Sequence, residues 1–270
     1  MSLPLKFAYW LAVVVSDAHY IFARKDRIAV RDNLRVIFPQ KSDREICRIR
    51  LKMYRNFAKY LADFFRFPRI DKNYVQENTK IENKVFLEDA MRKGKGVIIL
   101  SAHIGNWELG AVAVSFSGYP LWVVALSHKE KKVNDFFIRQ RKSKGVKIIP
   151  LGRAVKQCLA ALKMNELVAL VGDRDFGENG AVIDFFGKPS RFPKGPAAFA
   201  VKTGAPILPG IMVRNADDSF TLKIEKPVEF NTSGDDESDI RDLISRYKVI
   251  FEEYIRRYPE QWYMFRRFWI

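Results

Sequence analysis

The order of hydrophobic and polar residues changes character near residue 84. Before that point, apolar residues recur every three or four positions, as they do along one face of a helix. After it, short continuous apolar runs alternate with amphipathic stretches. Such runs, separated by helices, are typical of parallel strands that are covered on both faces. The pattern therefore predicts an α/β fold with a helical region in front of it.

One helix in the first region has clearly marked ends. Ser42 is a good N-cap, and Glu45 in the first turn completes a capping box. Apolar residues continue at helical spacing as far as Phe64, and Pro68 ends the pattern. The sequence predicts a long helix here, with a basic face opposite its apolar one.

Beyond residue 84 the sequence predicts alternating helices and strands. Buried parallel strands are expected at 96–102, 121–127, 146–151 and 166–173. Helices are expected at 85–94, 106–118, 131–145, 154–165, 196–204 and 240–258. The glycine-rich stretch 176–195 is interpreted as a loop, and an antiparallel strand pair is expected at 206–213 and 220–230. A mainly parallel central sheet flanked by helices follows from this order.

Charge narrows the class of partner. The chain has 47 Lys and Arg against 31 Asp and Glu, a formal net charge of +16. An excess of this size favours nucleic acid, an anionic bilayer, or acidic and phosphorylated ligands. The only cysteines, Cys47 and Cys158, lack the spacing of metal ligands and are interpreted as reduced thiols in a cytoplasmic setting.

The N-terminal segment has an apolar run at 7–15 that is shorter than the roughly 20 residues needed to span a bilayer. Asp17 interrupts any extension, and no small-residue cleavage site follows, so a secretory signal is not expected. A buried core helix and a helix lying in the membrane interface both remain open. Trp10 and the basic pair Arg24-Lys25 favour the interfacial helix, which is assigned to residues 1–30.

The stretch SAHIGNWELG, residues 101–110, places chemistry where a buried strand ends. If Asn106 caps the next helix, His103 precedes it and Glu108 falls in its first turn. The carboxylate could then fold back on the imidazole and leave its other nitrogen as a free base. Ser101 would lie roughly 6.6 Å away along the strand, too far for a direct hydrogen bond. A base acting on a substrate hydroxyl is favoured, although a capped helix with a structural histidine stays open.

Four motifs together carry a resemblance to a known family. HIGNWE resembles the H-x-x-x-x-D/E motif of glycerolipid acyltransferases, and more narrowly that of the lipid A biosynthesis acyltransferases, the late lauroyl and myristoyl transferases. Residues 33–49, 170–209 and 258–269 resemble further signatures of that family in the same order.

The resemblance implies a single glycerolipid-acyltransferase-like domain over residues 31–270. His103 would take a proton from a hydroxyl of a lipid or glycolipid, such as a lipid A precursor, and Glu108 would orient it. That hydroxyl would attack a thioester of acyl carrier protein or coenzyme A, with no cofactor and no metal. The enzyme would lie on the cytoplasmic side of the inner membrane, bound to its anionic surface as a peripheral or monotopic protein.

Basic side chains supply candidate substrate-binding residues. Arg139 and Arg141 lie near the end of the predicted helix 131–145, and Arg141 best matches an arginine of similar enzymes. Either could bind phosphate or polarise the thioester, although a solvated basic face is equally open. Lys194 and Gly195 directly precede the predicted helix at 196–204, where a helix N-terminus could bind an anion.

The Asp173-Arg174-Asp175 sequence is most simply a self-paired loop, in which Arg174 offsets the two carboxylates, and it also supports two functional interpretations. By resemblance, Asp173 or Arg174 orders the loop or contacts the acceptor. Alternatively, Asp173 and Asp175 could bind a divalent metal in a glycosyltransferase. For the protein as a whole, a non-catalytic basic lipid-binding protein is a further alternative.

Aromatic residues mark two further stretches. Phe185 and Phe186 are candidates to line an acyl groove. The stretch 262–270 interleaves aromatic residues with arginines, which suits a bilayer interface. A nucleic-acid partner is not expected, because the sequence contains no recognisable nucleic-acid-binding module.

Overall fold

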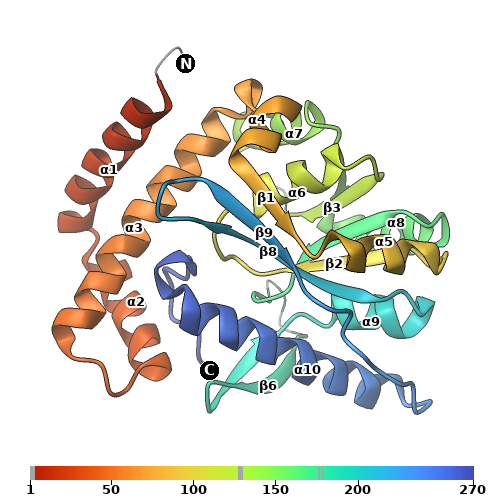
Figure 1. The fold of residues 1–270 in the computed structure, drawn as a ribbon. Helices are drawn as coiled ribbons and strands as arrows, with labels where there is room; N and C mark the ends of the chain where they lie inside the picture. The colour runs from red at the N-terminus through yellow and green to blue at the C-terminus, as the bar shows by residue number, and fades with distance from the viewer. Residues whose placement is uncertain (1–3, 127–129, 176, 178) are drawn as a thin grey trace.

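A computed structural model describes residues 4–126, 130–175, 177 and 179–270 of the chain (Figure 1). Its centre is a seven-stranded sheet in the order β1-β9-β8-β2-β5-β3-β4. The strands of this sheet are β1 (Thr79–Glu82), β2 (Val97–Ser101), β3 (Leu121–Ala125), β4 (Lys147–Pro150), β5 (Leu167–Val171), β8 (Ile207–Arg214) and β9 (Phe220–Ile224). Neighbouring strands are parallel except β8 and β9, which are antiparallel. The predicted fold class is confirmed.

Helices cover both faces of the sheet (Figure 1). Their bounds are α1 (Leu5–Phe22), α2 (Arg24–Ile37), α3 (Asp43–Phe65), α4 (Lys72–Asn78), α5 (Lys84–Arg92), α6 (Trp107–Phe116), α7 (Lys131–Lys142), α8 (Ala154–Lys163), α9 (Gly195–Thr203) and α10 (Asp236–Arg257). Side chains of β2 alternate between two cores, because successive residues of a strand point to opposite faces. Val97 and Ile99 pack with α5 and α6, whereas Ile98 and Leu100 face the core of α8, α9 and α10.

Most predicted elements are confirmed, including the capping box of α3. The Ser42 hydroxyl accepts a hydrogen bond from the Glu45 amide, and the Glu45 carboxylate accepts one from the Ser42 amide. The expected strand at 121–127 ends at Ala125 in the structure, and Ser127 lies outside the described residues. Cys47 is exposed, Cys158 is buried, and both are free thiols.

The prediction of a loop at 176–195 is wrong, because most of this stretch forms a hairpin of β6 (Ala181–Phe185) and β7 (Lys188–Phe192). Residues of β6 alternate between buried and exposed, the period-two pattern of a half-buried strand. Phe186 and Gly187 form its two-residue turn with φ of 54° and 76°, which matches the twist of a hairpin. Phe185, a candidate to line an acyl groove, is fully buried in the core beside Phe192 and Phe268, and the other candidate, Phe186, lies in the turn.

The N-terminal region contains two helices, and α1 is the outermost, with α3 between it and the rest of the fold (Figure 1). Residues 1–30, predicted as one interfacial helix, contain the end of α1 at Phe22 and the start of α2 at Arg24. Among the described residues, no helix combines the length and apolar character that crossing a membrane requires.

Candidate active site

The candidate site lies at the carboxyl edge of the parallel sheet, where β2 and β5 end side by side. Ser101 is paired in register with Val171. His103 and Asp173 each lie two residues further on, so the same register brings them together. His103 Nδ1 is 2.6 Å from Asp173 Oδ1. Ligand and catalytic sites in open α/β folds characteristically occur at this edge.

Asp173 is fully buried, and it is held as a carboxylate by the groups around it. Its Oδ2 accepts a hydrogen bond of 3.0 Å from the Trp262 indole N–H. Burial opposes ionisation, but His103, Arg174 and Trp262 outweigh it and lower the pKa of Asp173 to about 2. An ionised carboxylate at Nδ1 requires the ring to keep a proton there. In the neutral imidazole this hydrogen bond therefore leaves the lone pair on the other ring nitrogen, Nε2.

A sharp turn, residues 103–106, connects β2 to α6. Gly105 has φ of 63°, and a Cβ on it would lie 1.9 Å from the carbonyl oxygen of Met212. Only glycine therefore fits this position. Asn106 caps α6 as predicted, since its side-chain oxygen accepts a hydrogen bond of 3.0 Å from the Leu109 amide.

The C-terminal segment after α10 fixes this turn from the other side. The Gly105 amide donates to the Gln261 carbonyl oxygen at 2.9 Å, and the Tyr263 amide donates to the His103 carbonyl oxygen at 3.0 Å. Trp262 and Tyr263 are 1% and 2% exposed. The expectation that residues 262–270 suit a bilayer interface is corrected for these two aromatic residues, because they are buried against the turn 103–106.

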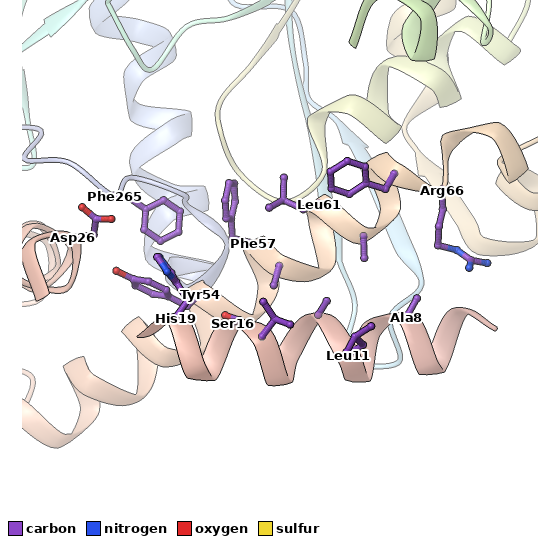
Figure 2. A pocket seen from close by; sticks show the side chains of 15 residues that line it. Ala8, Leu11, Ser16, His19, Asp26, Tyr54, Phe57, Leu61, Arg66 and Phe265 are labelled. Carbon is purple, nitrogen blue, oxygen red and sulfur yellow. The ribbon is translucent and has the colours of Figure 1, made fainter. Parts of the chain in front are cut away.

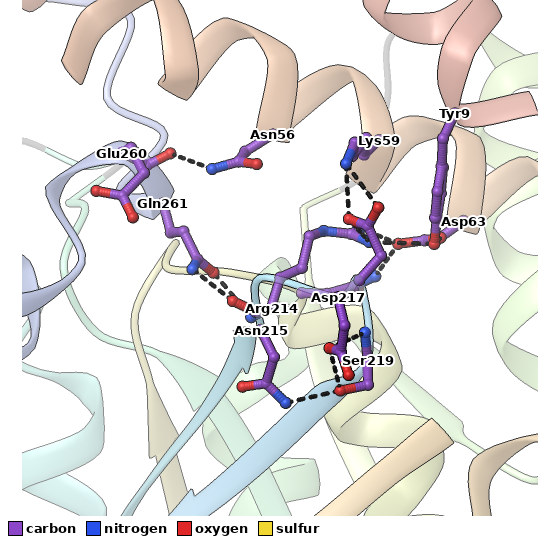
Figure 3. A network of polar contacts seen from close by, with 12 residues as sticks. Tyr9, Asn56, Lys59, Asp63, Arg214, Asn215, Asp217, Ser219, Glu260 and Gln261 are labelled. Carbon is purple, nitrogen blue, oxygen red and sulfur yellow. Dashed lines mark hydrogen bonds and ion pairs between the residues drawn. The ribbon is translucent and has the colours of Figure 1, made fainter. Parts of the chain in front are cut away.

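Below the turn lies a buried polar network (Figure 3). Asn106 donates a 2.9 Å hydrogen bond to Asp63 of α3, and Asp63 forms an ion pair with Arg214 of β8. Arg214 and Gln261 exchange two hydrogen bonds, from the Arg214 amide at 2.9 Å and to its carbonyl oxygen at 2.8 Å. The Tyr9 hydroxyl of α1 donates to Asp63 at 2.5 Å. Four segments remote in sequence, namely α1, α3, β8 and the segment after α10, thus meet next to the turn that contains His103.

Glu108 has a different partner from the one expected. Its carboxylate accepts two hydrogen bonds from the Arg141 guanidinium, from Nε at 2.9 Å and from a terminal nitrogen at 2.5 Å. Glu108 is 5% exposed, so this bidentate pair is largely shielded from water. The contact to the imidazole comes from Asp173, and Glu108 instead ties α6 to α7. Spacing in the sequence predicted Glu108 as the carboxylate partner of His103, whereas the register of β2 against β5 places Asp173 there.

The other predicted substrate-binding residues differ in whether they adjoin the His103–Asp173 pair. Arg174 lies next to Asp173, and its guanidinium donates to the Tyr263 carbonyl oxygen. Arg139 is exposed on α7. Lys194 forms a 2.6 Å ion pair with Glu237 at the start of α10.

Two predicted residues have structural contacts of their own. Gly195 begins α9. The carboxylate of Asp175 accepts hydrogen bonds of 3.1 Å from two backbone amides, those of Gly177 and Gly180. Asp173 and Asp175 therefore have different hydrogen-bond partners.

Aromatic rings form one wall of the site. The Trp107 ring lies edge-on to the His103 ring, with centroids 4.9 Å apart, and Tyr60 stacks on Trp107 at 4.5 Å. A narrow apolar cavity of about 50 Å³ begins beside Trp107 and Glu108 and runs between α6 and the sheet. Tyr60 and Trp262 were not predicted as residues of the site, because neither belongs to a local sequence motif that contains His103.

The geometry provides an oriented imidazole base. The Ser101 hydroxyl donates to the neighbouring Ala102 carbonyl oxygen at 3.4 Å, whereas the imidazole is held by Asp173. A base held by a buried carboxylate can remove a proton from a bound hydroxyl, which then acts as the nucleophile.

Comparisons with known proteins identify the family of the chain. Residues 2–270 match the model of a family described as bacterial lipid A biosynthesis acyltransferase. A phosphatidylinositol mannoside acyltransferase of Mycolicibacterium smegmatis is 29% identical over 219 residues, covering 80% of this chain and 70% of the relative. The protein of the same name from Mycobacterium tuberculosis is 28% identical over 231 residues, covering 80% and 68%. A lipid A biosynthesis acyltransferase of Haemophilus influenzae is 23% identical over 243 residues, covering 89% and 74%.

Proposed function

The chain belongs to the bacterial lipid A biosynthesis acyltransferase family and is an acyltransferase, and from that premise we propose its substrates and mechanism. It moves a fatty acyl chain from a thioester to a hydroxyl of a lipid or glycolipid at a membrane surface. The observation that carries the proposal is the 2.6 Å contact between His103 Nδ1 and buried Asp173.

The reaction begins when His103 Nε2 takes the proton of the acceptor hydroxyl. The hydroxyl oxygen attacks the thioester carbonyl carbon, a C–O bond forms, and the C–S bond breaks. The imidazolium returns its proton to the departing sulfur, so the products are an ester and a free thiol. Asp173 stabilises the positive charge that the ring carries during the transfer.

Charge and relatives guide the choice of substrates. The donor is the thioester of acyl carrier protein or coenzyme A, and the net charge of +16 attracts either, since both are acidic. The acceptors in the names of the relatives, phosphatidylinositol mannoside and lipid A, suggest a glycolipid acceptor of that kind.

Residues 1–30 provide contact with an anionic membrane in this proposal, at the cytoplasmic face of the inner membrane. The support is the outer face of α1, where large apolar side chains are exposed: Phe7, Trp10, Val14, Ile21 and Phe22. Exposed apolar surface of this extent commonly marks a membrane or protein contact. Arg24 and Lys25 follow directly, and basic side chains complement anionic headgroups.

The proposal is tested by measuring thiol release from acyl carrier protein and coenzyme A thioesters with a glycolipid acceptor. The wild type should release thiol only when acceptor is present, and His103→Ala should lower the rate by about 10²–10⁴. Circular dichroism checks that the variant is folded. Release that continues in His103→Ala, or that requires a divalent metal, would contradict the mechanism.

A further inference from the structure

A groove on the N-terminal side of the molecule lies between α1 and α3 (Figure 2). Its volume is about 630 Å³, within the range of roughly 300–1,000 Å³ that is usual for ligand sites. Figure 2 shows Ala8 and Leu11 on the α1 side, with Phe57 and Leu61 on the α3 side. The size and the apolar walls suit a hydrocarbon chain.

The groove arises from small side chains on both helices. Ala8 and Ala12 follow one another on α1 at a spacing of one helical turn, as do Ala58 and Ala62 on α3. Neither pair fills the space between the helices. Larger residues such as Leu61 contribute the apolar walls.

Polar contacts hold the two helices together beside this hollow. Arg55 of α3 donates two hydrogen bonds to Asp17 of α1, at 2.8 and 2.7 Å. Tyr9 of α1 bonds to Asp63 of α3, which is 2% exposed. These contacts fix the helix pair without requiring its apolar surfaces to close on one another.

The groove is connected to the catalytic base by packed aromatic rings. Phe57 lines the groove and stacks on Tyr60, with centroids 5.6 Å apart. Tyr60 stacks on Trp107, and Trp107 contacts His103. Three rings in series, those of Phe57, Tyr60 and Trp107, thus separate the groove from His103, so a chain within it does not bring its own carbonyl carbon to the imidazole.

We propose that the α1–α3 groove binds a hydrocarbon chain of the lipid acceptor. This inference rests on the proposed function. The carbonyl carbon of the acyl group being transferred must lie next to His103 during the reaction. In an acceptor, by contrast, a headgroup separates the hydrocarbon chain from the reacting hydroxyl. Because aromatic rings lie between the groove and His103, the position of the groove fits the hydrocarbon chain of an acceptor.

The surroundings of the groove support a chain that enters from a bilayer. Leu11 and Val15, which line it, are 39% and 59% exposed, so the groove is open to the surface. Trp10 and Phe22 extend the exposed apolar surface along α1. A lipid could therefore move its chain sideways into the groove while its headgroup stays at the membrane surface.

The binding test uses a lysophospholipid whose chain is parinaric acid, since its fluorescence rises in an apolar site. Ala12→Phe and Ala58→Phe fill the groove from opposite helices, and each should raise the Kd of the probe at least tenfold. Ala18→Phe adds the same ring to an exposed position of α1 outside the groove, and it should leave the Kd unchanged.

Unchanged binding in both filled variants would overturn the proposal. An equal loss in all three variants would overturn it as well, because the loss would then not depend on filling the groove. The assay contains no donor and involves no turnover. A wild type that binds the probe as expected but transfers no acyl group would refute the proposed function and leave the groove assignment standing.

Steady-state kinetics distinguish the acceptor from the donor. The filled variants should raise the KM for the lipid acceptor, with little change in the KM for the thioester or in the rate with a chain-free headgroup. A raised KM for the thioester alone would assign the groove to the donor and overturn the proposal.

Discussion

At the scale of single residues, the turn 103–106 of the proposed active site depends on backbone contacts as much as on side chains. His103 is held at its carbonyl oxygen by the Tyr263 amide and at Nδ1 by Asp173. Gly105 brings the chain against the Met212 carbonyl oxygen, in a left-handed conformation that favours glycine. Small displacements at this turn should therefore affect the rate strongly.

Gly105→Ala should displace the turn, because its Cβ would overlap the Met212 carbonyl oxygen. A shift of about 1 Å at a reacting group can cost roughly 10²-fold in rate, so transfer should fall at least that far. Gly118→Ala is the matched control, since Gly118 has φ of 94° with no atom within 4 Å of the added Cβ. It should cost about 1–2 kcal/mol of stability and spare the rate. Equal rates in the two variants would contradict this account of the turn.

At the scale of elements, the Glu108–Arg141 pair joins α6 to α7. Both side chains are largely buried, with exposed fractions of 6% and 12%. Removing one charge leaves the other without its partner in a poorly solvated place, which is more costly than losing an exposed pair. The Lys84–Glu88 pair of α5 is a suitable comparison, since its side chains are 46% and 43% exposed.

Glu108→Gln should lower the free energy of unfolding by about 3–5 kcal/mol, whereas Lys84→Met should lower it by less than about 1 kcal/mol. Replacing Glu108 by Gln and Arg141 by Met together should recover part of the loss. Urea denaturation measures all three variants. A double variant no more stable than Glu108→Gln alone would show that the pair is not the cause.

The helices and strands also show how much of the structure could be predicted from the sequence. Strand and helix positions were predictable because apolar periodicity and the capping box of Ser42 and Glu45 are local. The partner of His103 was not, because Asp173 reaches it only through the register of β2 against β5. An aspartate directly after a buried strand was the available signal. The β6–β7 hairpin was missed because its turn, Phe186-Gly187, lacks the usual Asn-Gly or Asp-Gly signature.

At the scale of the whole molecule, charge and apolar surface belong to the same proposed contact. The net charge of +16 favours an anionic surface, and α1 exposes apolar residues on the outermost layer of the fold (Figure 1). Electrostatic attraction would bring the protein to the surface, and the apolar side chains would hold it there. Such binding should depend on both salt and α1.

Sedimentation with vesicles tests this contact. The wild type should bind phosphatidylglycerol vesicles more tightly than phosphatidylcholine vesicles, and added salt should weaken binding because it screens exposed charges. Phe22 is 83% exposed, and Phe22→Ser removes apolar area worth about 1.5–3 kcal/mol if fully buried in lipid. A loss of roughly tenfold or more in affinity is therefore expected. Equal affinity for both vesicle types at all salt concentrations would argue against the contact.

The most direct test of the central claim is the transfer rate of Asp173→Asn with a glycolipid acceptor. The pKa of Asp173 is about 2, so the wild type keeps this carboxylate ionised throughout the neutral range. The amide preserves its shape but removes the charge that holds the imidazole tautomer and stabilises the imidazolium. A fall of about 10²–10⁴ in kcat in a folded variant is predicted. A folded Asp173→Asn variant with wild-type kcat would contradict the assignment of His103 and Asp173 as the catalytic pair.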